Sequence, residues 1–257
     1  MPVLALAYPV GAVLLTSVAA AFIPGQVTST EVVIGLLAGV CGASGIGLLY
    51  RALAAGPMGV VSPLTAVIAC VVPVAVGLLR GDRLTGIAVI GMVGAAIAIV
   101  LVSRERKEFA RVRLGTVLIS LASGTLMGCY LALIGIAPVS GGIWPTVISR
   151  WTSTAVVLAV FLLLLARRTR RPELPFESRY PWLLVIVSGT LDASANAVYQ
   201  LATQNGLLAI VAVLGSLYPV TTVVLAWIVL RERLAGVQLV GVVIACASAA
   251  ALSLPAG

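Results

Sequence analysis

Long apolar stretches follow one another along the whole chain, and they constrain its fold more than any other feature. A run of about 20 apolar residues is long enough to cross the hydrocarbon core of a bilayer as a helix. Such runs predict nine membrane-spanning helices at residues 3–23, 31–54, 57–79, 84–103, 114–134, 145–166, 181–203, 207–230 and 234–254. Short connections join them, which is typical of a compact helical bundle.

Composition excludes a soluble protein. The chain is 61% apolar and only 9% charged, with a mean hydropathy of +1.19. A soluble protein of this length could not cover its surface with so few charges. We therefore predict an all-α, multi-pass membrane protein whose surroundings are the lipid bilayer.

The net charge of +8 does not indicate a nucleic-acid partner, because no basic stripe with interleaved aromatic residues exists to follow a phosphate backbone. Most basic residues fall in the short loops, where they set membrane orientation. With nine spans, one side receives Arg51, the basic loops at 104–113 and 167–179, Arg231 and Arg233. The other side receives only Arg80, Arg83 and Arg150. The first side is expected to be cytoplasmic, with Met1 inside and Gly257 outside.

Two parts of the sequence are similar to each other at a constant offset. Residues 56–103 align without gaps on residues 206–253. The motif DRLTG at 82–86 meets ERLAG at 232–236 within this alignment, and a match of acidic residue, arginine, leucine and glycine is harder to obtain by chance than matches of leucine alone. The similarity indicates an internal repeat.

The helix count then predicts two repeats of opposite topology. Residues 1–103 would form the first repeat with four helices, and residues 114–254 the second with five. Units with five helices insert in opposite orientations, and inverted repeats are a signature of secondary transporters. The helix at 114–134 has no partner upstream, so a first helix is expected to be missing, either because the start is truncated or because the protein is a natural variant with nine helices.

Three segments carry a resemblance to a known family. They are LLYRALAAGPMGVVSPLTAVIACVVP at 48–73, GDRLTGIAVIG at 81–91, and DASANAVYQLATQNGLLAIVAVLGSLYPVTTVVLAWIVLRERLAGVQLVG at 192–241. In this combination the sequence resembles the EamA branch of the drug/metabolite transporter superfamily, over nearly the whole chain.

The resemblance implies a ten-helix inverted-repeat transporter with a central cavity formed by both halves. It implies export of small metabolites or amphipathic compounds across the cell membrane, in bacteria the inner or plasma membrane. A homodimer is compatible with it.

Asp192 is the only acidic residue in the middle of a predicted span. A carboxyl group deep in hydrocarbon is costly and is by default a functional-site hypothesis. Asn196 and Gln200 follow at intervals of four, which places all three side chains on one helical face. Asp192 could exchange a proton for substrate or bind a cationic group. The alternative is a structural carboxyl group, satisfied by Asn196 or by a neighbouring helix.

Further polar and aromatic residues extend this candidate site for substrate or proton coupling. Tyr199 and Gln200, with Asn196, could orient a substrate through hydrogen bonds or hold helices together. Arg150 could pair with Asp192, attract an anionic group, or extend to the membrane interface. Tyr130 could line the cavity.

Three prolines, Pro63, Pro73 and Pro219, fall within predicted spans. Each lacks a backbone donor and permits a kink. The kinks could act as hinges or could serve packing alone.

The remaining chemistry favours a protein that is not an enzyme. The sequence Gly42-Ala43-Ser44-Gly45 matches the GxSG of intramembrane serine proteases, but the chain contains no histidine to act as the base. Its four cysteines are widely separated, which predicts neither a metal site nor a disulfide, and no glycine-rich phosphate loop or cofactor motif is present. The first hypothesis is a secondary transporter working by alternating access on a small-molecule substrate. The second is a structural or accessory membrane subunit that transports nothing.

Overall fold

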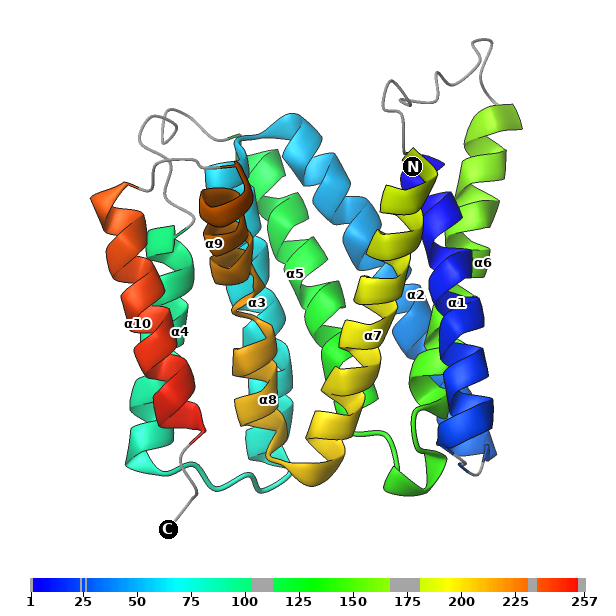
Figure 1. Cartoon of the computed structure of the whole chain (residues 1–257), viewed down its shortest axis with the longest axis horizontal. Helices are drawn as coiled ribbons and strands as arrows, with labels where there is room; N and C mark the ends of the chain where they lie inside the picture. The colour runs from blue at the N-terminus through cyan, green and yellow to red at the C-terminus, as the bar shows by residue number, and fades with distance from the viewer. Residues whose placement is uncertain are drawn as a thin grey trace. The chain divides into compact units, whose positions relative to one another are not determined.

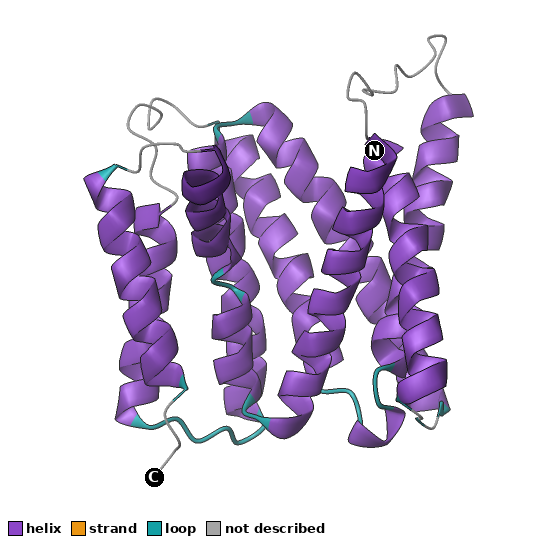
Figure 2. Ribbon diagram, viewed as in Figure 1, coloured by secondary structure: helices purple, strands orange, loops and turns teal. Residues whose placement is uncertain are grey.

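The computed structural model describes residues 2–23, 25, 27–102, 113–166, 181–230 and 235–253. All regular structure in these residues is helical (Figure 2). The elements are α1 (Pro2–Phe22), α2 (Ser29–Ala55), α3 (Met58–Leu79), α4 (Gly86–Val102), α5 (Leu114–Gly135), the short 3-10 turn η1 (Val139–Gly141), α6 (Trp144–Ala166), α7 (Pro181–Asn205), α8 (Leu208–Gly215), α9 (Tyr218–Leu230) and α10 (Gly236–Leu252). Most of the basic loop at 104–113, the loop at 167–179, Arg231 and Arg233 lie outside the described residues. The orientation that they predict remains a prediction.

All nine predicted segments are helical in the structure. Seven stretches of the described chain are long and apolar enough to cross a membrane, in α1, α2, α3, α5, α6, α7 and the α8–α9 segment. The other two, α4 and α10, are apolar helices of 17 residues. Such a helix is about 25 Å long, close to the hydrocarbon thickness of about 30 Å. The chain is therefore an all-α, multi-pass membrane protein.

One predicted helix, at residues 207–230, is divided in two in the structure. α8 ends at Gly215, and α9 begins at Tyr218 after a short turn. Pro219 provides the reason, because it has no N–H to donate to the Gly215 carbonyl and its ring would clash with that carbonyl. The N–H of Val220 donates instead to the Leu217 carbonyl at 2.9 Å. The sequence predicted one helix with a kink permitted at Pro219, whereas the structure has two helices joined by a short turn.

The chain divides into two compact units, and each unit is assembled from both halves of the sequence. Unit 1 comprises Met1–Ala43 and Leu133–Asn205, and unit 2 comprises Ser44–Ala132 and Gly206–Gly257. Unit 1 therefore contains α1, α6 and α7, and unit 2 contains α3, α4, α8, α9 and α10 (Figure 1). The boundaries at residues 43–44 and 132–133 fall inside α2 and α5, so both of these helices contribute to both units.

In unit 2, α4 and α10 pack against each other in antiparallel directions. A Cβ atom added to Gly91, near the start of α4, would lie 3.0 Å from the side chain of Leu252 at the end of α10. One added to Gly241, near the start of α10, would lie 2.7 Å from the side chain of Val102 at the end of α4. The Gln238 amide also donates to the Val102 carbonyl at 3.3 Å. Small residues at these points allow the two backbones to approach closely.

The helix bounds repeat at the offset found in the sequence. The shift that carries residues 56–103 onto 206–253 also carries both ends of α4 onto the ends of α10. It carries the start of α3 onto the start of α8, and the end of α2 onto the end of α7. Corresponding helices that run antiparallel, as α4 and α10 do, are what an inverted repeat requires. The inverted repeat, and its division at residues 1–103 and 114–254, remain predictions.

In unit 1, two matching glycines lie against backbone carbonyls of neighbouring helices. A Cβ atom added to Gly39 on α2 would lie 2.6 Å from the Ser149 carbonyl oxygen on α6. One added to Gly189 on α7 would overlap the Ala7 carbonyl oxygen on α1. Gly39 also accepts a hydrogen bond of 2.8 Å from the Ser153 hydroxyl. Gly39 and Gly189 correspond to each other when the two similar parts of the sequence are aligned. The same close contact between a glycine and a backbone carbonyl therefore occurs in both.

In unit 2, α5 packs on α3 through glycines as well. A Cβ atom added to Gly124 would lie 2.7 Å from the Thr65 carbonyl oxygen, and one added to Gly128 would lie 3.0 Å from the Ala69 carbonyl oxygen. The Ala69 carbonyl is the acceptor that Pro73, four residues later, cannot use. The α5 backbone thus covers the place where the α3 hydrogen-bond ladder is interrupted.

This packing predicts that Gly124→Ala destabilises the protein. The added methyl group would meet backbone rather than a flexible side chain, and overpacking of this kind costs about 1–3 kcal/mol. We expect a lower thermal unfolding midpoint for the purified protein in detergent.

Gly47→Ala is the matched control, because a Cβ atom at Gly47 on α2 meets nothing within 4 Å. Alanine has the higher helix propensity, so this change should leave the midpoint unchanged or raise it. Equal midpoints for the two variants would show that the α3–α5 contact is not tight.

Candidate functional site

Two helices of unit 1 carry polar side chains that face each other. Thr146 and Arg150 are four residues apart on α6, and Asp192, Asn196 and Gln200 are four apart on α7, so each set lies on one helical face. The two faces meet in two contacts, one between Arg150 and Asp192 and one between Thr146 and Gln200.

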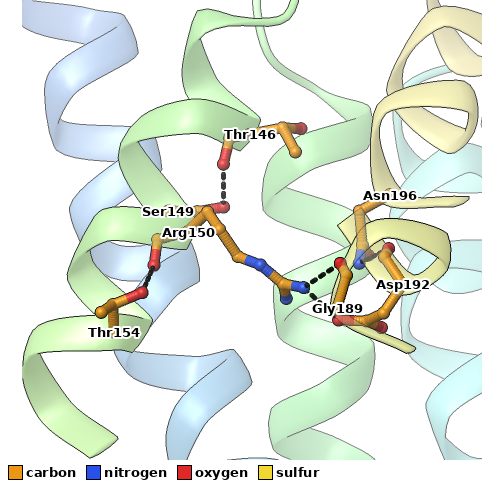
Figure 3. A network of polar contacts seen from close by, with 7 residues as sticks. All are labelled: Thr146, Ser149, Arg150, Thr154, Gly189, Asp192 and Asn196. Carbon is orange, nitrogen blue, oxygen red and sulfur yellow. Dashed lines mark hydrogen bonds and ion pairs between the residues drawn. The ribbon is translucent and has the colours of Figure 1, made fainter. Parts of the chain in front are cut away.

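The first contact is an ion pair. The Arg150 Nη2 atom donates to Asp192 Oδ2, and it also lies 3.5 Å from the Gly189 carbonyl oxygen (Figure 3). The two partners differ in burial, since the Arg150 side chain is 8% exposed and the Asp192 side chain 53% exposed. The arginine is therefore fixed inside the unit, whereas one side of the carboxylate remains open.

Helix α1 completes the surroundings of Arg150. The Arg150 guanidinium carbon lies 4.4 Å from the centroid of the Tyr8 ring, a cation–π contact. A Cβ atom added to Gly11, one turn further on, would lie 2.9 Å from Arg150 Nε. Gly11 thus leaves the space that the guanidinium occupies. Arg150 Nε is buried and has no hydrogen-bond partner among the described residues, so the ion pair and the Tyr8 ring carry most of the compensation for burying the charge.

The second contact caps a helix. The Oε1 atom of Gln200 accepts from the Thr146 N–H at 3.2 Å and from the Thr146 hydroxyl group. Thr146 lies in the first turn of α6, where backbone N–H groups have no partner within the helix. Gln204, one turn after Gln200, donates to the Gly142 carbonyl at 2.8 Å just before α6. The end of α7 therefore fixes the start of α6, and the fully buried Gln200 is one of the residues that do so.

The other predicted site residues take different places. The Asn196 amide donates to the Asp192 backbone carbonyl at 2.7 Å, so it lies beside the ion pair (Figure 3). Tyr199 is buried on α7, on the neighbouring side of the helix. Tyr130 lies on α5 in unit 2. Their roles towards a substrate remain predictions.

The three prolines differ in their local structure. Pro63 and Pro73 lie inside α3, which is one continuous helix, whereas Pro219 lies in the first turn of α9 after the break described above. A hinge function remains a prediction for all three.

Sequence reasoning did not identify three residues that shape the site. Thr146 could have been found, because it precedes Arg150 by one helical turn and so shares its face. Tyr8 and Gly11 on α1 carried no comparable signal, since nothing in their local sequence relates them to a residue on α6.

The polar groups that the site presents are an ion pair and an amide. The described residues contain no group of three or more His, Cys, Asp or Glu side chains that could hold a metal ion. What they do contain is a carboxylate open on one side, a fixed guanidinium group beside it and an amide one turn away.

Comparisons with known proteins also indicate a transporter. Residues 114–254, which extend from α5 to α10, match the sequence model of the EamA-like transporter family. Among curated proteins, none matches the sequence. Eighteen chains of solved structures match. One, titled "Crystal structure of protein", has a TM-score of 0.77 and 17% sequence identity, covering 98% of this chain and 88% of that one. At this identity the likeness shows a shared fold alone.

The geometry predicts energetic coupling between Arg150 and Asp192. In a cycle of Arg150→Met, Asp192→Asn and the double variant, each single change removes the same ion pair, so the double variant should lose less than the sum of the two. We expect a coupling energy of about 0.5–1 kcal/mol from thermal or denaturant unfolding, at the low end of the usual range because Asp192 is half exposed.

A second cycle, which combines Arg150→Met with Asn205→Ala at the exposed end of α7, serves as the control and should be additive. Additivity in the first cycle would show that the ion pair contributes nothing measurable.

Proposed function

Because the chain belongs to the EamA-like transporter family, which the match over residues 114–254 shows, we propose that it is a secondary-active transporter. It exports small metabolites or amphipathic compounds across the cell membrane by alternating access. Two observations on the sequence support this class of mechanism: the chain has no glycine-rich phosphate loop for ATP, and a carboxyl group lies within a membrane-length helix.

The observation that carries the proposal is the Arg150–Asp192 pair. The guanidinium group is held in place by its burial, by the Tyr8 ring and by the space at Gly11. The carboxylate is half exposed and can therefore be reached from outside unit 1. A carboxylate that is anchored on one side and open on the other can exchange partners without disturbing the helices that carry it.

Proton coupling would act through the charge of this pair. With Asp192 ionised, the two charges cancel. When a proton binds to Asp192, the pair loses its attraction and the site carries one positive charge, which belongs to Arg150. A substrate that binds to only one of these two charge states is then transported together with a proton or in exchange for one. Asn196, beside the carboxylate, would orient the substrate through its amide.

Alternating access needs parts of the protein that move as bodies. The two compact units are suited to this, because each is held together by close helix contacts and α2 and α5 each run through both. The break between α8 and α9 at Pro219 offers a further place where the backbone can change direction.

The proposal predicts that transport by the purified chain, reconstituted in liposomes, depends on an imposed pH gradient and that Asp192→Asn removes this dependence. The amide is isosteric with the carboxyl group but cannot exchange a proton, so the pH gradient would no longer drive the flux. A panel of small cationic, anionic and amphipathic compounds, measured by flux in both directions, would identify the substrate and test export.

Two variants control for other effects. Asp192→Glu keeps a carboxyl group in the site and should retain pH-dependent transport in part. Asp82→Asn removes a carboxyl group elsewhere and should transport as the unchanged protein does. Asp82 accepts a hydrogen bond of 3.0 Å from the Ala209 N–H, and asparagine can replace it in this role.

Unchanged pH dependence in Asp192→Asn would refute the coupling role. If the chain transports none of the compounds but is recovered with another membrane protein, an accessory subunit is the better description.

A further inference from the structure

An apolar groove lies in unit 2, on the surface of α3 and α4, whereas the Arg150–Asp192 pair belongs to unit 1. The volume of the groove is about 370 Å³, which is within the range of about 300–1,000 Å³ typical of ligand sites. Buried residues form its floor, among them Ala95, Ile99 and Val213. Exposed residues form its rim, among them Val71, Leu78 and Val93. Small exposed side chains on α3 and α4, such as Ala75 and Ala96, leave the space open.

The length of the groove corresponds to one leaflet of a bilayer. Its lining on α3 runs from Val67 to Leu78. At a rise of about 1.5 Å per residue, these residues cover about 16 Å of the helix. Half of a hydrocarbon core of about 30 Å is about 15 Å. An extended acyl chain that enters from one membrane surface would therefore fill the groove to the middle of the bilayer.

Positive charge stands at one end of the groove. Leu78 is the last groove residue on α3, and Arg80 follows two residues later as the C-cap of that helix. Arg80 and Arg83 are both exposed in the short connection to α4. Asp82, between them, is partly buried, and its carboxylate accepts from the Ala209 N–H at the start of α8. The acidic group is thus turned towards α8, while both arginines remain at the surface.

We propose that this groove binds one anionic phospholipid. An acyl chain lies between α3 and α4, and the phosphate of the headgroup contacts Arg80 and Arg83. Lipid tails are as apolar as the groove, so the tail alone provides little selectivity over the surrounding bilayer. The selectivity comes from the arginines, because basic side chains near a membrane surface attract anionic headgroups.

The test is a lipid titration of the intact chain in detergent. Phosphatidylglycerol or phosphatidylcholine is added, and the lipid molecules bound to the protein are counted by native mass spectrometry. We expect one phosphatidylglycerol molecule to bind in preference to phosphatidylcholine. Arg80→Gln with Arg83→Gln should reduce this preference by about fivefold for each arginine. Arg51→Gln, at an exposed position on α2, is the matched control and should keep the preference.

A second pair of variants tests the groove itself. Ala96→Phe places a ring in the groove and should abolish lipid binding. Ala247→Phe adds the same ring at an exposed position on α10 and should leave lipid binding unchanged. Unchanged lipid binding in Ala96→Phe would overturn the proposal, as would an unchanged preference in the double arginine variant. The proposal would also be wrong if Ala96→Phe converted a dimer of the chain to a monomer, because the groove would then be a contact between two copies.

Discussion

Helices in a membrane gain nothing from hydrophobic association, because lipid tails are as apolar as the side chains that they would replace. The helices of this chain are held together by close backbone approach and by hydrogen bonds to backbone carbonyls. Gly39 on α2 and Gly189 on α7 each lie against a carbonyl of a neighbouring helix, and Ser153 adds a hydrogen bond to Gly39. The site depends on this packing, since the helices that carry Arg150 and Asp192 are held by these contacts.

The same surroundings make every buried polar group costly unless it finds a partner. Arg150 meets this requirement through Asp192 and the face of the Tyr8 ring, and Gln200 meets it in part through the open backbone N–H at the start of α6. These two contacts have different roles. Gln200 is fully buried and serves the helix end, whereas Asp192 keeps one side open. Of these two residues, Asp192 is therefore better placed to change its partner during the transport that we propose.

Small residues have two effects in this protein. Where a second helix follows them, as at Gly91 and Gly241, they allow α4 and α10 to pack tightly. Where none fills the space, as at the exposed Ala96 on another face of α4, they leave a groove at the surface of α3 and α4. A groove of this kind in a membrane-spanning segment is filled by lipid unless another chain occupies it, and the arginines after α3 add charge selectivity to that contact.

The sequence by itself determined where the helices lie, because a helix that crosses a bilayer needs about 20 apolar residues and few charges. It also indicated the repeat that relates 56–103 to 206–253, and it singled out Asp192, since a carboxyl group in an apolar run is rare. Only the tertiary structure decided which of the possible partners Arg150 takes and that Tyr8 and Gly11 surround it. It also decided that Pro219 follows a helix break while Pro63 and Pro73 do not interrupt α3. The physical reason is the same in each case. Local sequence sets the period and length of a helix. Contacts between helices that are far apart in the chain depend on close approach at single residues, and these contacts leave no pattern in the local sequence.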